Sequence, residues 1–575
     1  MAEMILPGTY IDVRPEGLIA PGQITVGNIG VIGTAAKGPI GVPQLLGSMQ
    51  DALQTFYAYD SWIDPSTLKK RDNELTLTRA LELAFNFGGN IVYAVRVADT
   101  TTAAKAVSAT YVVPAATGGM TSATLTAKSE GTWANDGLGV NVAAAQQDAY
   151  VRNQDVSPGA DTVGGTALPL GRTPKQSARN RVTHHNDASG TTQTLTVIPS
   201  GVPGAGAAVF AGGTVTLGDF VAQSDKVYVS YAVDATNAKT VTLQLDRAQE
   251  TYTVVDGTDL VAQINDPQTG SAWATAAAGT KPDDLPAVTA QPPNSPPVFA
   301  AFKGGTNGEI AADYQAGLDA LLNQQAHIIV AAGQDDSFGN RLDADVQKAS
   351  TDAIKRDRIA VVGSRLMQQN QLETSFDQII GHNLDSDRVI FVAPGMKTTD
   401  VPTGTEVTLP GAYTAAAFAG LLSSLPPQAS PTNKTLAVDD LETHFDAAHL
   451  TLLVENRVLA LEQKQGFHVV RGITTTTGGA FAQITTRRIV DYAKYGVRSA
   501  ADPYIGLLNN ERVRSALAAT LRSFLAGMVQ DEMLESYDVS VTATRAEEIR
   551  GIVNVTMTLR PVFSIDFIQV TMFLQ

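Results

Sequence analysis

The sequence lacks cysteine and has few charged or aromatic residues. None of the 575 residues is cysteine, which excludes disulfide bonds, thiolate nucleophiles and sulfur-ligated metal sites. Charged residues make up only 17% and aromatic residues 6% of the chain. The formal net charge is -16, so we expect no broad cationic surface and no direct nucleic-acid partner.

Long apolar runs are also missing. No stretch approaches the roughly 18 consecutive apolar residues of a membrane-spanning helix, so we expect no direct membrane contact. Residues 1–8 lack the basic start and apolar run of a signal peptide. These absences are compatible with folding in a reducing cytoplasm.

Both ends of the chain have the pattern of β-strands. The first strand holds Thr9, Tyr10, Ile11 and Val13, and the second runs from Ile565 to Leu574. In the second strand one face carries Ile565, Phe567 and Phe573, and the other carries Ile568, Val570, Met572 and Leu574. A strand that is apolar on both faces is expected to be buried on both. It is an aggregation hazard unless it joins a sheet edge, and the edge of a neighbouring copy would serve. The pattern favours a polymer subunit, and the alternative is that both ends pair within their own domain.

The chain between these ends predicts an α/β and α+β multidomain protein. Strands that alternate with helices indicate a parallel sheet, and the Thr-, Ala-, Gly- and Val-rich middle of the chain indicates an all-β insertion. We expect an N-terminal arm at 1–20, an α/β domain at 21–99 and 303–409, an insertion at 100–302, a C-terminal assembly domain at 410–555 and a strand arm at 556–575.

Apolar residues at three- and four-residue spacing predict the helices. One helix follows Asn73 as N-cap and ends at Gly88. Further helices are expected at 312–323, 344–355, 372–380, 412–425, 441–461, 486–495 and 510–534. Strands near 537–544 and 552–559 are expected to lead into the C-terminal arm.

Residues of the kind found in enzyme sites occur without a catalytic pattern. Ile24 to Gly33 is expected to be a buried strand that ends in a turn, and Gly27 to Gly33 lacks the spacing of a dinucleotide fingerprint. The turn from Gly33 to Gly38 lacks Gly-Lys-Ser/Thr, so a tight turn is favoured over a phosphate site. Carboxylates flank strands of the α/β layer, where enzymes place catalytic groups, but helix capping and loop solvation explain them equally well. These carboxylates are Asp335, Asp336, Asp385 and Asp387.

The histidines also lack the spacing of a metal site. His444 and His449 lie five residues apart, which places them poorly for one helical face. His184 and His185 lie in a polar stretch with no evident acidic partner. We therefore expect no catalytic residue, no cofactor and no bound metal.

Several motifs follow one another along the chain in a recognisable order. They are Pro7–Val13, Val31–Pro39, Phe87–Val97, Ala127–Leu138, Val470–Thr475, Arg487–Ile489, Phe524–Gly527 and Pro561–Gln575. In this order they resemble the tail sheath proteins of contractile bacteriophage tails and related contractile injection systems. The element Ala127–Leu138 departs from the family pattern because Ala134 stands where glycine is usual.

The resemblance implies a non-enzymatic structural role. Sheath subunits form hexameric rings that stack helically around an inner tail tube, and contraction drives the tube through a target envelope. Baseplate and tail terminator proteins would be further partners, in a virion tail or an injection particle assembled in the bacterial cytoplasm. Both terminal arms would add strands to the C-terminal domains of neighbouring subunits, and the insertion would face outward. A different shell or surface-layer subunit, or an α/β enzyme with a β-rich binding insertion, remains an alternative.

A local excess of positive charge indicates a contact with the inner tube. Residues 482–526 hold seven Lys or Arg against three acidic residues, in a chain of net charge -16. We predict that part of this segment faces the inner tube, and ordinary intramolecular ion pairs are the alternative. The candidates are Arg487, Arg488, Arg498, Arg512, Arg514 and Arg522. Candidate hinges for the arms are Pro15–Leu18 and Arg560–Pro561.

Overall fold

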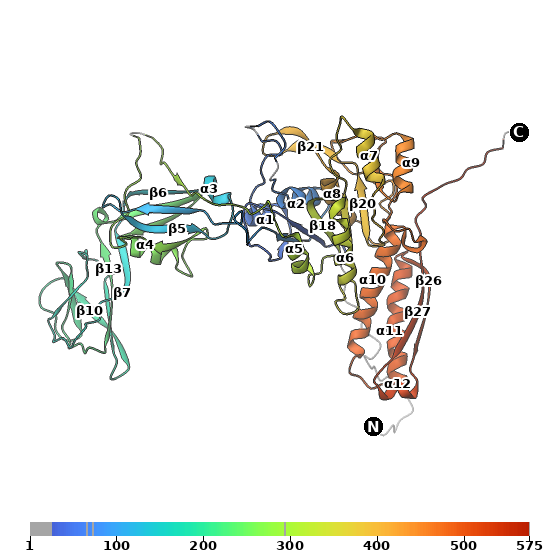
Figure 1. Ribbon diagram of the computed structural model, residues 1–575. Helices are drawn as coiled ribbons and strands as arrows, with labels where there is room; N and C mark the ends of the chain where they lie inside the picture. Colours follow the sequence, from blue (N-terminus) through green and yellow to red (C-terminus); the bar gives the residue numbers. More distant parts are fainter. Residues whose placement is uncertain (1–25, 65–66, 72–73, 293–294, 574–575) are drawn as a thin grey trace, which may run out of the picture. The chain divides into compact units, whose positions relative to one another are not determined.

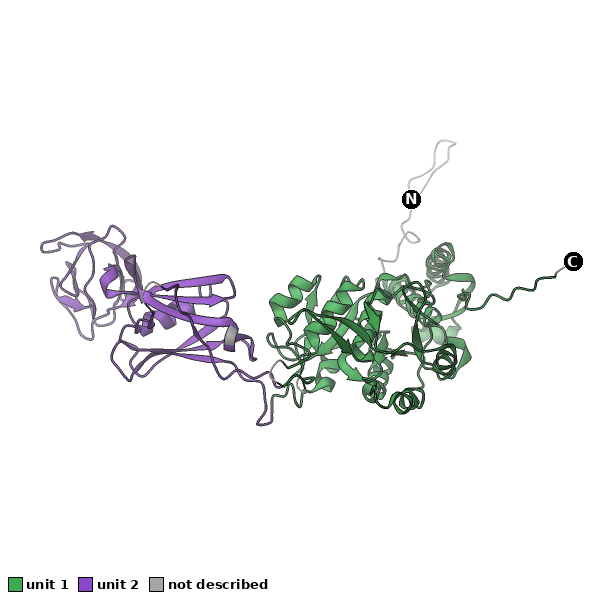
Figure 2. Cartoon of the chain, turned by 90° about the horizontal axis from the view of Figure 1, so that it is seen from above, with its two compact units in different colours: residues 1–100, 309–575 green, residues 101–308 purple. Residues whose placement is uncertain are grey.

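The computed structural model describes residues 26–64, 67–71, 74–292 and 295–573. The chain forms two compact units (Figures 1 and 2). Unit 1 comprises residues 1–100 and 309–575, and unit 2 comprises residues 101–308. The expected N-terminal strand with Thr9, Tyr10, Ile11 and Val13 lies outside the described residues, as does Asn73.

The centre of unit 1 is an eight-stranded sheet with the order β2-β3-β1-β18-β19-β20-β24-β25. Its strands are β1 (Ile29–Gly33), β2 (Gln44–Leu46), β3 (Val92–Arg96), β18 (Ile328–Asp335), β19 (Ile359–Gly363), β20 (Val389–Ala393), β24 (Leu459–Gln463) and β25 (Phe467–Val469). All pairs from β3 through β24 are parallel, and the two edge strands pair antiparallel. Every residue of β1, β19 and β20 is buried.

Helices cover both faces of this sheet, which explains the continuous apolar strands. One face packs against α1 (Met49–Phe56), α2 (Leu77–Asn86) and α8 (Gly411–Ser424). The other packs against α5 (Tyr314–Leu321), α6 (Gly339–Ala349), α7 (Leu372–Ile380) and α9 (Ala447–Glu455). A small sheet of β21 (Met396–Asp400), β22 (Thr405–Leu409) and β23 (Asp440–Leu441) packs with the helices of the first face. The 3₁₀-helix η3 (Asp336–Phe338) packs with those of the second.

Unit 2 is built from three antiparallel-rich sheets. The orders are β7-β13-β9-β10-β11-β12-β8, β15-β14-β6-β17 and β16-β5-β4. The strands are β4 (Thr110–Pro114), β5 (Thr121–Ala127), β6 (Leu138–Ala144), β7 (Ala149–Asp155), β8 (Ala167–Pro169), β9 (Arg181–Asn186), β10 (Thr191–Ile198), β11 (Ala207–Ala211), β12 (Thr214–Leu217), β13 (Lys226–Val233), β14 (Lys239–Leu245), β15 (Ala248–Val254), β16 (Ala274–Ala278) and β17 (Ala300–Ala301). The unit also holds helices α3 (Trp133–Gly137) and α4 (Gly257–Ile264) and the 3₁₀-helix η2 (Ala235–Asn237), so the expectation of an all-β insertion is too simple.

The last part of unit 1 is a helical pair with a β-hairpin on it (Figure 1). It contains the 3₁₀-helix η4 (Gly479–Phe481), α10 (Ile484–Ala501), the 3₁₀-helix η5 (Asp502–Tyr504), α11 (Glu511–Gln530), β26 (Leu534–Thr542), α12 (Arg545–Ile549) and β27 (Asn554–Pro561). The expected domain boundary at Pro410 differs from this architecture, because α8, β24 and β25 belong to the eight-stranded sheet and its covering layer.

Two expected helices are misplaced. The helix expected at 441–461 is wrong, because α9 ends at Glu455 and β24 begins at Leu459. Between them Arg457 has a φ of +64°, which a continuing helix does not allow. The helix expected at 344–355 is α6, which begins five residues earlier at Gly339 and ends at Ala349.

The helical pair depends on a close approach at Gly496. A Cβ atom at Gly496 would lie 1.8 Å from the ring of Phe524, whereas a Cβ at Gly527, also on α11, would meet nothing within 4 Å. We therefore expect Gly496→Ala to lower the unfolding free energy by about 1–3 kcal/mol through overpacking. Gly527→Ala is the control, and we expect it to be neutral or to stabilise by up to about 1 kcal/mol. Denaturant unfolding followed by circular dichroism measures both, and equal midpoints would contradict this packing.

Candidate functional site

The helices α10 and α11 form a layer whose apolar residues face each other and the hairpin. On α11 the large buried apolar residues are Leu517, Leu521, Leu525 and Met528, which recur at three- and four-residue spacing. Tyr492 of α10 stacks on Phe524 of α11 with 6.1 Å between ring centroids. The layer therefore presents an apolar surface on which a sheet can pack.

The hairpin of β26 and β27 covers this layer with two strands. Its inner residues are Tyr537, Val539, Val541, Val555, Met557 and Leu559, and they pack against the helices. Its outer residues include Asp538, Ser540, Thr556 and Thr558, and they are exposed. Among the described strands none pairs with the outer edge of β26 or of β27.

Two strands are too narrow to cover two helices. Neighbouring strands lie about 4.8 Å apart, so a hairpin spans about 10 Å, which is the width of roughly one helix. Consistent with this, apolar residues of the layer are only partly buried, including Tyr492, Val497, Tyr504 and Phe524. The inner hairpin residues Val555, Met557 and Leu559 are also half-buried. The hairpin therefore leaves these apolar residues only partly covered.

The C-terminal residues that were predicted to form a strand are exposed. Ile565, Phe567, Ile568, Val570, Met572 and Phe573 have between 72% and 87% of their surface accessible. The described residues 562–573 form no strand and pair with no described strand of the chain. Pairing of this end within its own domain is therefore not what the structure shows, and pairing with a neighbour stays a prediction.

The tube-facing prediction is wrong for two of its six arginines. Arg487 and Arg488 are buried on α10. Arg487 forms ion pairs with Asp387 and Asp491, and Arg488 donates to the carbonyl oxygens of Leu425 and Pro426. A local charge count misses this, because the acceptors are brought in by the fold.

The other four arginines differ in how much of the side chain is available. Arg498 is half-buried and pairs with Asp357, and Arg514 pairs with Glu548 at 2.9 Å. Arg512 and Arg522 are exposed, although Arg522 also donates to the carbonyl oxygen of Val539 at 3.2 Å. Arg512 and Arg522 are therefore the members of the set with most surface for a partner.

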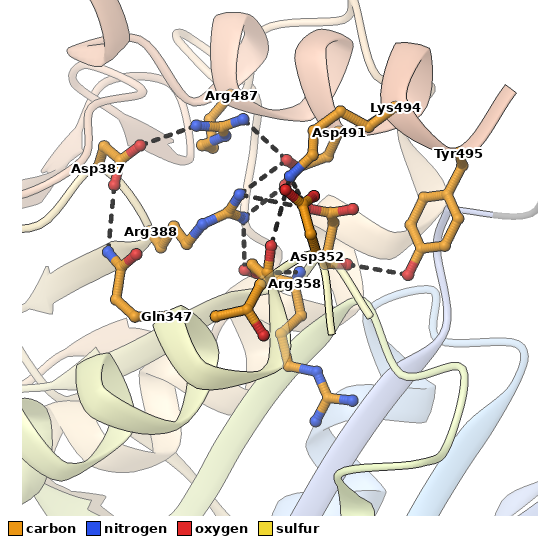
Figure 3. A network of polar contacts seen from close by, with 12 residues as sticks. Gln347, Asp352, Arg358, Asp387, Arg388, Arg487, Asp491, Lys494 and Tyr495 are labelled. Atoms are coloured by element: carbon orange, nitrogen blue, oxygen red, sulfur yellow. Dashed lines mark hydrogen bonds and ion pairs between the residues drawn. The ribbon is translucent and has the colours of Figure 1, made fainter. Parts of the chain in front are cut away.

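A network of buried ions joins α10 to the parallel sheet (Figure 3). Arg388, which precedes β20, donates to both carboxylate oxygens of Asp491 at 2.8 and 3.0 Å. Asp357, which precedes β19, accepts from Lys494 and Arg498 of α10 and from Arg388 at 3.5 Å. Burial acts to lower the pKa of Arg388, but Asp491 and Asp357 outweigh it and the pKa is raised. Charged side chains of the network therefore hold α10 against the N-terminal ends of the central strands β19 and β20.

His327 lies next to this network. Its ring packs edge-on against Tyr495 of α10, with 5.5 Å between centroids. Burial, together with the positive charges of Arg358, Arg488 and Arg356, lowers the pKa of His327 to about 4. The imidazole is neutral at physiological pH and fills the junction as a packing group.

The residues considered as catalytic candidates have structural partners. Asp335 caps η3 through the backbone N–H of Ser337, and Asp336 pairs with Arg365 at 2.9 Å. Asp385 accepts from the backbone N–H of Thr477 at 2.8 Å. The expected buried strand that ends at Gly33 is confirmed in its last part by β1, which holds Gly30 and Gly33.

Two of the histidines considered as metal ligands have acidic partners in the structure. His184 bonds Asp225 at 2.9 Å, so the absence of an acidic partner was a wrong inference. His444 lies 2.9 Å from Asp440. Within the described ranges no group of three or more His, Cys, Asp or Glu side chains could hold a metal ion. No helix in the same ranges has the length and apolar character needed to cross a membrane.

Removal of the central carboxylate tests the ion network. Asp491→Ala would leave Arg388 and Arg487 buried without their shared acceptor, and we expect it to lower the unfolding free energy by roughly 3–5 kcal/mol. The control is Asp319→Ala, which breaks an exposed pair with Lys348 and should cost less than about 1 kcal/mol. Denaturant titration measures both variants, and a loss of under 1 kcal/mol for Asp491→Ala would contradict a supporting role.

Acid should weaken the same junction through His327. Because its pKa in the folded chain is lower than the ordinary value of 6.5, unfolding takes up a proton between about pH 6.5 and 4. Stability is therefore retained above pH 6.5 and falls by up to about 3 kcal/mol as the pH drops toward 4. We expect His327→Gln to remove this part of the pH dependence when unfolding is measured from pH 4 to 7. Parallel pH curves for the two proteins would contradict it.

Two solved structures are similar to this chain over most of its length. A sheath tail protein from Desulfitobacterium hafniense is 14% identical, covers 96% of this chain and 100% of its own, and gives a TM-score of 0.55. A sheath tail protein from Listeria innocua is 12% identical, covers 96% of this chain and 95% of its own, and also gives a TM-score of 0.55. At these identities the likeness shows the fold alone.

Sequence families give a more specific result. No curated protein sequence matches the chain. Residues 308–475 match the phage tail sheath protein central domain, and residues 476–575 match the phage tail sheath C-terminal domain. The two matches follow each other in order and place residues 308–575, the C-terminal part of the chain, in the phage tail sheath family.

Proposed function

We propose that this chain is the structural subunit of a contractile sheath. It polymerises as stacked hexameric rings around an inner tail tube, and contraction drives the tube through a target cell envelope. Membership of the sheath family supports the general role. The observation that carries the proposed linkage is a helix layer half covered by the hairpin of its own chain, together with an exposed apolar arm.

Strand addition between copies accounts for both features. Two packed helices span about 20 Å, which is the width of about four strands at 4.8 Å spacing. The hairpin supplies two of them. We infer that neighbouring subunits supply the others, from the N-terminal strand with Thr9, Tyr10, Ile11 and Val13 and from the C-terminal strand with Ile568, Val570 and Met572.

This arrangement separates linkage from packing. Backbone hydrogen bonds of an added strand persist while the bodies rotate, whereas contacts between bodies can be exchanged. Contraction without nucleotide hydrolysis then requires the extended array to be metastable, with better-matched surfaces buried in the contracted array. The ion network around Asp491 supports this mechanism because it ties α10 to the sheet and favours movement of unit 1 as one body.

The remaining partners follow from the proposed sheath role. Arg512 and Arg522 are the candidates for a screened electrostatic contact with the inner tube protein, which can be released when the rings widen. Baseplate and tail terminator proteins would meet the two ends of the sheath, in a virion tail or an injection particle. The insertion, which forms unit 2, would face outward.

Electron microscopy of truncated chains tests the proposal. We expect the full chain, alone or co-expressed with its tube protein, to form hollow tubes. Removal of residues 1–15 or of residues 568–575 should abolish the tubes, because each deletion removes a donated strand. A chain in which Gly and Ser replace 568–575 is the length-matched control and should fail as well. Normal tubes from both truncated chains would overturn strand addition, and flat lattices would favour a shell or surface-layer protein.

A further inference from the structure

The root of the C-terminal arm is held by two side chains from elsewhere in unit 1. Gln483, which precedes α10, accepts from the backbone N–H of Ser564 at 3.2 Å and donates to the Ser564 carbonyl at 3.4 Å. Its amide also donates to the Asp566 carboxylate at 3.1 Å. Arg471, which follows β25, donates from Nε to the same carboxylate at 2.9 Å. We call Arg471, Gln483, Ser564 and Asp566 the arm clamp.

The clamp separates the residues up to Phe567, which contact the rest of unit 1, from the exposed residues 568–573. The Asp566 side chain is only 7% exposed, and the Arg471 guanidinium lies over the Phe567 ring at 5.3 Å from its centroid. Before the clamp, Pro561 pairs with Leu534 in the hairpin and the N–H of Val562 donates to Met533. The hinge expected at Arg560–Pro561 is therefore wrong. Among the described residues beyond Phe567, 568–573, none forms a hydrogen bond, ion pair or ring contact with the rest of the chain, and the side chains of Ile568, Val570 and Met572 are exposed.

A strand that begins after the clamp is amphipathic. Because successive side chains of a strand alternate, Ile568, Val570, Met572 and Leu574 share one face. The other face carries Gln569, Thr571, Phe573 and Gln575. Of the three apolar residues on that second face of the whole segment, Ile565 and Phe567 lie at the clamp, and Phe573 alone lies in the free part.

This pattern matches the site that the helix layer leaves open. The hairpin already shows an apolar inner face on the helices and a polar outer face, so a strand added beside it needs the same alternation. Residues 568–575 are eight in number, equal to the eight residues of β27, and extended they span about 26 Å. The occupant thus matches the site in length and in pattern.

We propose that the arm clamp starts the donated strand at Ile568 and sets its inward face. Ile568, Val570 and Met572 then lie on the open part of the α10–α11 layer of a second copy, and Gln569 and Thr571 face solvent. This inference rests on the proposed strand addition and adds where the strand begins and which side chains it buries. Arg471 and Gln483 are positioning residues, because they fix the arm without contacting the second copy.

Spin labels test the clamp in the unassembled chain. The sequence has no cysteine, so single cysteines at Ile565 and Gln569 can be labelled without further substitutions. In dilute monomer we expect a restricted label at 565 and a mobile label at 569. Asp566→Ala should make the label at 565 as mobile as that at 569, while the unfolding midpoint stays unchanged. Equal mobility at both positions in the otherwise unaltered chain would overturn the clamp.

A matched pair of substitutions tests which face of the donated strand is buried. Val570→Asp and Thr571→Asp each add one carboxylate to neighbouring positions of the free segment. We expect Val570→Asp to raise the concentration needed for tube formation at least about tenfold, because it buries an unpaired charge. Thr571→Asp should change it less than about twofold. Equal effects would overturn the assigned face, whereas tubes that survive deletion of 568–575 would overturn strand addition itself.

Discussion

The width of the α10–α11 layer is the constraint on which this structure depends. Two helices side by side expose an apolar surface about twice as wide as a two-stranded hairpin. The chain covers part of that surface with β26 and β27 and leaves Tyr492, Val497 and Phe524 partly buried. Under the proposed strand addition the subunit completes its packing only on assembly, which couples stability to assembly.

Other features of unit 1 keep that layer in a defined position. Gly496 lets α10 and α11 approach until Phe524 meets the backbone of α10. Arg388 and Asp357, at the starts of adjacent strands, bind charged side chains of α10. Buried pairs of this kind add little net stability compared with apolar packing, but they are costly to break, so they hold one arrangement. A rigid body with flexible links is what a sheath needs if its rings must move without separating.

The sequence predicted elements well where the signal is local. Helix α7 begins at Leu372 and ends at Ile380, as its apolar spacing indicates. The helix prediction for 441–461 was wrong because two largely apolar runs, Leu450–Val454 in α9 and Val458–Leu461 leading into β24, follow each other closely. The backbone conformation at Arg457 separates the helix from the strand, and the apolar pattern does not show it. Short apolar runs do not distinguish a helix from a buried strand.

Side-chain partners could not be predicted, because they depend on tertiary structure. Arg487 was interpreted as a surface cation, but Asp387, 100 residues earlier in the chain, meets it in the fold. The same holds for His184 with Asp225 and for Gln483 with Asp566. The apolar pattern of the C-terminal arm was visible in the sequence, whereas the point at which the arm leaves the body required the structure.

A cryo-electron microscopy reconstruction of the assembled particle tests the central claim most directly. The account predicts a sheet of about four strands on α10 and α11, in which β26 and β27 are flanked by strands traced to other copies of the chain. A reconstruction in which both hairpin edges remain unpaired, or in which residues 568–573 fold back onto their own subunit, would contradict it.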